Sequence, residues 1–209
     1  MIEWIGANSE LVNIVINAVL TMVWIVYLNL FLHGIVRTRR PMIMISRGAG
    51  SGPEARLFIS NMGAEPIYVT ALIADVRCGG QERSVTITQN DEIQADDLDT
   101  PSARTNEGPL DAGSYMDGGS FGALMDRIAL HADGRGDPAS IERVTLTVVA
   151  ATGHSAAISA GVKTYRVLRK EGATMFHPEH LSTRQLRNRL SRRRLLNRLN
   201  RDLQAELRA

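Results

Sequence analysis

The longest apolar stretch of the chain covers residues 11–33 and contains no Asp, Glu, Lys or Arg. A helix rises about 1.5 Å per residue, so this stretch spans roughly 34 Å, which exceeds the ~30 Å hydrocarbon core of a bilayer. A backbone in lipid must satisfy its own hydrogen bonds, and a helix does so. The pattern predicts a single transmembrane helix over 11–35, after a short leader at 1–10.

Basic residues lie on one side of this stretch only. Arg37, Arg39 and Arg40 follow it, whereas the leader contains Glu3 and Glu10 and no Lys or Arg. Cytoplasmic flanks of membrane helices are enriched in Lys and Arg, so we expect the N-terminus outside and the remainder in the cytoplasm, at a bacterial inner membrane. A cleaved signal peptide would need a basic leader, a shorter apolar run and a small-residue cleavage site. We therefore expect a retained anchor in the lipid bilayer.

Short β-rich runs separated by turn residues follow the anchor. Strands are expected at 42–46, 55–60, 67–77, 83–88, 114–117, 141–151, 155–159 and 163–168, and a short helix at 121–130. Strands and helices do not alternate as they would in a parallel sheet. The pattern predicts a mainly β fold, with an antiparallel β-sandwich over 41–170 and a polar excursion from it at 89–113. A linker at 171–181 then leads to a C-terminal helix at 182–208.

One strand pair has a recognisable turn. Residues 57–76 contain a strand, the spacing N-x-G-x-x-P at Asn61, Gly63 and Pro66, and a second strand. This pair resembles the opening hairpin of many bacterial immunoglobulin-like modules. Taken whole, the chain resembles uncharacterised single-pass inner-membrane proteins of alphaproteobacteria with an immunoglobulin-like cytoplasmic domain. The resemblance implies a fold and a location, but no activity.

Polar residues interrupt the predicted membrane helix at a helical spacing. Asn13, Asn17 and Thr21 are four residues apart and share one face with Trp24. A side-chain amide in hydrocarbon is costly unless it has a hydrogen-bond partner, so this face predicts contact with another membrane protein or with a second copy of the chain. The alternative is that Asn13 lies near the interface and Asn17 is tolerated by a strongly apolar helix.

Charge is segregated along the chain. The residues from 181 onward contain nine arginines and two acidic residues, a charge of +7, which leaves −5 for the rest of a chain whose formal net charge is +2. Such a basic tail is typical of an interaction segment. The candidate contact residues are Arg184, Arg187, Arg192, Arg193, Arg194, Arg198 and Arg201.

The tail contains no Gly or Pro from 182 to 208, so we expect a basic amphipathic helix capped by Ser182 or Thr183. Its apolar side is expected to contain Leu196, Leu199, Leu203 and Leu207, joined by Leu181 and more loosely by Leu195. The opposite side is expected to contain Arg184, Arg187, Arg194, Arg198 and Arg201. The helix then contacts the anionic leaflet, or packs its leucines on the sandwich or a partner while its arginines meet an acidic protein surface. Nucleic acid is a third option, disfavoured because the tail has no aromatic residue to stack on bases.

No residue pattern predicts catalysis, a cofactor or a metal. His177, Glu179 and His180 offer too few ligands for a metal site, and Cys78 excludes an internal disulfide because it is the single cysteine. The glycines at 48–52 lack the Gly-Lys-Ser/Thr of a phosphate loop, and the acidic residues at 91–99 lack the order of a calcium loop. The sequence predicts a non-enzymatic scaffold or accessory subunit of a membrane complex. The alternatives are a homo-oligomeric pore or sensor, and a tether for nucleic acid or ribosomes.

Overall fold

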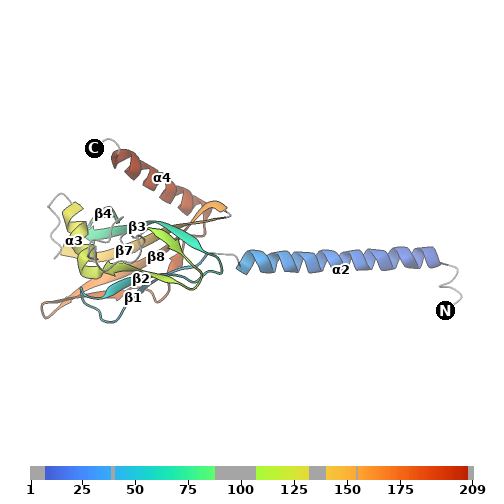
Figure 1. Ribbon diagram of the computed structural model, residues 1–209, viewed down its shortest axis with the longest axis horizontal. Helices are drawn as coiled ribbons and strands as arrows, with labels where there is room; N and C mark the ends of the chain where they lie inside the picture. Colours follow the sequence, from blue (N-terminus) through green and yellow to red (C-terminus); the bar gives the residue numbers. More distant parts are fainter. Residues whose placement is uncertain (1–7, 39–40, 88–106, 132–139, 154, 207–209) are drawn as a thin grey trace. The chain divides into compact units, whose positions relative to one another are not determined.

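The computed structural model describes residues 8–38, 41–87, 107–131, 140–153 and 155–206, in two units that divide between residues 40 and 41. The first unit contains helix α2, Ser9–Thr38 (Figure 1). Its segment Ser9–Gly34 is long and apolar enough to cross a membrane, and it is the single such helix among the described residues. Residues 13–34 are exposed, so the helix has no apolar partner among the described residues of its own unit.

The second unit is mainly β, and all of its strand pairs are antiparallel (Figure 1). A three-stranded sheet has the order β1-β2-β6, with β1 at Ile43–Arg47, β2 at Arg56–Asn61 and β6 at Tyr115–Ser120. A seven-stranded sheet has the order β10-β8-β7-β3-β4, with β10 at Arg184–Gln185, β8 at Ser155–Lys170, β7 at Ile141–Thr152, β3 at Ile67–Cys78 and β4 at Gln81–Ile87. Beside this path, β5 (Gly108–Leu110) pairs with β3, and β9 (Ala173–Pro178) pairs with β8. The predicted fold class is confirmed.

The hydrophobic core is built from alternate strand positions. Val144, Leu146 and Val148 of β7 are fully buried in it, as are Ile43 and Ile45 of β1. Side chains of a strand alternate between the two faces, so this alternation defines an inner and an outer face of the large sheet. On β3 and β7 the positions between the core residues therefore face outward.

Helix α3, Phe121–His131, lies at one end of the sheets and contributes Phe121, Leu124 and Ile128 to the same core (Figure 1). Ser120 caps it, because its hydroxyl accepts a hydrogen bond from the Ala123 amide at 3.1 Å. The predicted helix at 121–130 and its cap are confirmed. Phe121 also packs edge-on against Tyr165, with ring centroids 4.9 Å apart.

The N-x-G-x-x-P turn has a direct structural explanation. Asn61 ends β2 and is fully buried. Its side-chain amide donates to the carbonyl oxygens of Glu65 at 2.7 Å and Leu110 at 3.1 Å, and its side-chain oxygen accepts from the Gly63 amide at 3.0 Å. One asparagine thereby closes its own turn and ties it to β5.

Three predicted segments differ from the structure. The expected strands at 155–159 and 163–168 form one continuous strand, β8. Its Gly161 permits a close approach of neighbouring chain, since a Cβ there would lie 3.1 Å from both the Ile43 and the Thr183 side chains. The expected linker at 171–181 contains strand β9, and the segment expected to begin the tail helix instead forms β10. Of the predicted excursion at 89–113, residues 89–106 lie outside the described residues.

Candidate functional site

The polar face of α2 is the first candidate surface. Thr21 donates its hydroxyl hydrogen to the Asn17 backbone oxygen at 2.7 Å, so the helix itself satisfies that donor. The side chains of Asn13 and Asn17 are exposed and make no hydrogen bond with any residue that the structure describes. Trp24, seven residues beyond Asn17, is 67% exposed and meets Tyr27 edge-on. The face from Asn13 to Trp24 is therefore open to a partner along about three turns of helix.

The three arginines that predict the topology are placed only in part. Arg37 belongs to the last turn of α2, but its side chain lies outside the described residues. Arg39 and Arg40 lie outside them entirely.

The chain after β9 is held on the edge of β1 by side chains. Thr183 accepts a hydrogen bond from the Ile45 amide at 2.9 Å, and Gln185 accepts one from the Ile43 amide at 3.2 Å. The Gln185 amide also donates to the Ile43 carbonyl at 2.6 Å. These bonds replace part of a strand ladder, and they position the start of the tail on the β domain.

A buried lysine fixes the preceding turn. Lys163 is 7% exposed on the inner face of β8, and its ammonium group donates to the Leu181 carbonyl at 2.6 Å. Burial lowers the pKa of this ammonium group. Leu181 itself is exposed and does not join the helix side on which it was expected.

Helix α4, Arg189–Glu206, begins seven residues later than predicted. Its cap is Asn188, whose side-chain oxygen accepts from the Leu190 amide at 3.0 Å; the predicted caps Ser182 and Thr183 are wrong. Thr183 is engaged with β1 instead, which removes it from any helix start.

Helix α4 packs on the outer face of the large sheet. Leu195 is 8% exposed and lies in a small apolar cluster with Ala71 and Ile73 of β3, Val149 of β7 and Ala160 of β8. Leu199 and Leu186 pack against the same cluster. Leu196, expected on the apolar side, is 37% exposed, whereas Leu195, expected there only loosely, is buried; the helix is therefore rotated relative to the expected orientation.

Arg198 and Arg192 are held by the β domain. The Arg198 guanidinium forms an ion pair with Asp75 of β3 and a hydrogen bond with Ser84 of β4, and both Arg198 and Asp75 are about a third exposed. Arg192 donates to the Leu186 carbonyl at 2.8 Å. The prediction that Arg198 lies on the free side of the helix is wrong, because Asp75 pairs with it on the sheet side.

The remaining candidate arginines are exposed. None of them forms an ion pair with another described residue, although Arg201 donates to the Asn197 backbone oxygen within the helix at 3.3 Å. They are Arg184, Arg187, Arg193, Arg194 and Arg201. They give the outer side of the tail a positive charge on an ordered scaffold.

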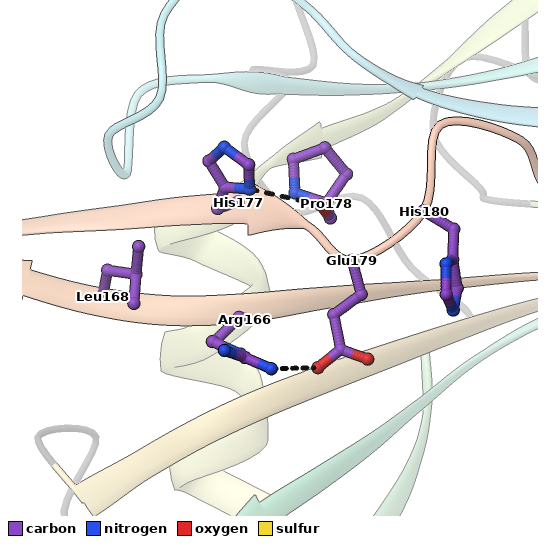
Figure 2. A pocket seen from close by; sticks show the side chains of 6 residues that line it. All are labelled: Arg166, Leu168, His177, Pro178, Glu179 and His180. Atoms are coloured by element: carbon purple, nitrogen blue, oxygen red, sulfur yellow. Dashed lines mark hydrogen bonds and ion pairs between the residues drawn. The ribbon is translucent and has the colours of Figure 1, made fainter.

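The segment containing His177, Glu179 and His180 lines a hollow of about 440 Å³ together with Arg166, Leu168 and Pro178 (Figure 2). Glu179 lies between two guanidinium groups, with its Oε1 atom 2.8 Å from a nitrogen of Arg143 and 3.5 Å from one of Arg166. Within the described ranges, no group of three or more His, Cys, Asp and Glu side chains is arranged to hold a metal ion. Glu179 is thus an ion-pair partner, a role that the sequence did not suggest.

Comparison of the chain with protein-family models, with curated proteins and with solved structures finds no match in any of the three.

Proposed function

We propose that this protein is a membrane-anchored, non-enzymatic scaffold or accessory subunit of an inner-membrane protein complex. In this proposal α2 spans the bacterial inner membrane and the β domain with α4 lies in the cytoplasm, because Arg37, Arg39 and Arg40 follow the apolar helix. The polar face of α2 contacts an integral membrane partner, and the exposed arginines of the tail contact that partner's cytoplasmic surface.

The observation that carries the proposal is the packing of α4 on the sheet. A basic helix that inserts into the leaflet needs a free apolar face, whereas Leu195 and Leu199 of α4 are engaged with the sheet. The exposed arginines therefore sit on a fixed support, which favours recognition of an acidic protein surface over insertion into anionic lipid. Pre-ordering a binding surface in this way lowers the entropy lost on association.

The unpartnered amides of α2 support the membrane half of the proposal. Polar contacts between membrane helices contribute about 0.6–2 kcal/mol each, and Asn13 and Asn17 lie one turn apart on the same face. Asn29 supplies an internal control, because it lies about 120° around the helix from Asn17 and 12 residues along it.

The test is native mass spectrometry of the full-length protein after gentle detergent extraction, with variants Asn17→Leu and Asn29→Leu. We expect a stoichiometric foreign membrane protein that is lost or reduced at least fivefold with Asn17→Leu and retained with Asn29→Leu. A complex of unchanged mass and abundance in both variants contradicts docking through the polar face.

Other compositions of the complex identify the alternatives. Several copies of this chain and nothing else would favour a homo-oligomeric pore or sensor built on the same face. Co-purifying RNA or DNA that is released by nuclease or moderate salt would favour a nucleic-acid or ribosome tether.

A further inference from the structure

Three arginines form a row across the outer face of the large sheet. Arg77 of β3 lies directly opposite Arg143 of β7, which in turn lies opposite Arg166 of β8. Val76 and Val144, adjacent to the first two along their strands, are buried in the core. Successive side chains alternate between faces, so the three arginines, here called the arginine row, share the outer face.

This arrangement is unfavourable for the fold alone. Directly opposite residues of antiparallel strands have Cβ atoms about 4.5–5.5 Å apart, and like charges at such positions destabilise a sheet. Glu82 lies opposite Arg77 at one end of the row, yet Arg77 forms no ion pair with it or with any other residue in the described ranges. The side chains of Arg143 and Arg166 remain 41% and 62% exposed.

One ion pair within the fold indicates that a carboxylate is a suitable ligand for the row. Glu179 pairs its carboxylate with both Arg143 and Arg166, and its side chain is only 19% exposed. Figure 2 shows the pair with Arg166. This carboxylate contacts two of the three guanidinium groups, and Arg77 has no ion-pair partner among the described residues. A hollow of about 450 Å³ adjoins the row. Its charged lining consists of four arginines and two acidic residues, of which Asp75 is already paired with Arg198: Arg77, Arg83, Arg143, Arg198, Asp75 and Glu82.

We propose that the arginine row is the docking site for an acidic segment of a partner protein, whose carboxylates bind Arg77 and Arg143 and compete with Glu179 for Arg166. The row spans three strands, or about 10 Å, and alternate side chains of an extended segment are about 7 Å apart, so two carboxylates reach it together. Arginine favours such planar, bidentate recognition of carboxylates. The proposal deepens the proposed function by adding, beside the tail, a second cytoplasmic contact of stated chemistry on the sheet, and it rests on that function.

The test uses the full-length protein in nanodiscs of zwitterionic phosphatidylcholine and a fluorescent deca-glutamate peptide, with binding followed by anisotropy at low salt. Arg77→Gln and Arg143→Gln are each expected to weaken binding about tenfold. The charge-matched control is Lys170→Gln, which removes an exposed positive charge at the end of β8 and is expected to change binding less than twofold. Denaturation midpoints of all variants establish that each is folded.

Glu179→Gln provides the second readout. It keeps the shape of the side chain and removes the competing carboxylate, so we expect the peptide to bind about threefold more tightly. Weaker or unchanged binding in this variant overturns the proposal, since a purely structural Glu179 would not compete.

Equal losses in Arg143→Gln and Lys170→Gln also overturn it, because binding would then follow net charge. The proposal is also overturned if the arginine substitutions weaken binding of an oligothymidylate of equal charge and leave binding of the peptide unchanged. If the peptide test fails but Asn17→Leu still dissolves the membrane complex, the acidic-segment site is wrong and the proposed function stands. If the peptide test succeeds but the complex does not depend on Asn17, docking through the polar face of α2 is wrong and the acidic-segment site stands.

Discussion

Tyr165 carries a hydroxyl group that the fold buries without a hydrogen-bond partner among the described residues. Its side chain is 0% exposed on the inner face of β8, and its ring packs against Phe121. Phenylalanine keeps the ring and removes the oxygen. A buried hydroxyl that loses its water partners costs about 1–3 kcal/mol, so we expect Tyr165→Phe to raise the free energy of unfolding at pH 8 by about 1 kcal/mol.

The same burial makes the effect depend on pH. Burial raises the pKa of the Tyr165 phenol to about 12, although the Arg47 guanidinium lowers it in part. The unfolded phenol ionises near pH 10. Below pH 10 the phenol is neutral in both states and its titration does not affect stability. As the pH rises from 10 to 12, the unfolded state ionises first, and the free energy of unfolding of the wild-type protein falls. One pKa unit corresponds to about 1.4 kcal/mol, which predicts a loss of about 1.4 kcal/mol by pH 11 that the phenylalanine variant does not share.

The assay is guanidinium denaturation of the full-length protein in detergent at pH 8, 10 and 11, followed by circular dichroism. Both proteins share every other titrating group, including Lys163, so the difference between them isolates Tyr165. We expect the variant's advantage to grow from about 1 kcal/mol at pH 8 to about 2.4 kcal/mol at pH 11. A variant that is less stable than wild type at pH 8, with a difference independent of pH, would refute the reasoning, because the hydroxyl would then have a favourable partner.

Two further substitutions test the turn and the tail. Asn61→Ala removes three hydrogen bonds from a fully buried site, and we expect it to lower the free energy of unfolding by about 2–4 kcal/mol, measured by the same denaturation at pH 8; a loss below 0.5 kcal/mol contradicts the role of Asn61. Leu195→Ala removes the buried contact of α4, which is worth about 1.5–3 kcal/mol, so trypsin is expected to cleave within α4 at least tenfold faster. The control is Leu196→Ala, which makes the same change in helix propensity at an exposed position. Equal cleavage of the two variants would show that α4 does not pack through Leu195.

Much of the fold was predictable because its signals are local. The apolar run of α2, the alternation of Val144, Leu146 and Val148 and the cap at Ser120 all depend on residues close together in sequence. The turn spacing after Asn61 was recognised, but its bond to the Leu110 carbonyl, 49 residues away, was not. Local patterns identify elements, and contacts between distant elements decide what each polar group does.

The start of the tail was mispredicted for the same reason. The residues from 182 to 188 contain no Gly or Pro and match a helix start, but Thr183 and Gln185 hydrogen-bond with the backbone of β1. These partners are about 140 residues distant in the chain, so no local pattern reveals them. The ion pairs of Glu179 with Arg143 and Arg166 depend likewise on strand register.

The leucines of α4 form two overlapping apolar faces, and the sheet packs against one of them. Leu195 and Leu196 lie about 100° apart around the helix, and either can centre an apolar side with Leu199. With Leu196 at the centre, Arg198 would lie about 200° away, in solvent; with Leu195 at the centre, it lies about 60° to one side, within reach of the sheet. Asp75 occupies that position on β3 and pairs with Arg198. Packing through the Leu195 side therefore brings Arg198 to Asp75, and it leaves Arg193, Arg194 and Arg201, not Arg198, available to an acidic partner.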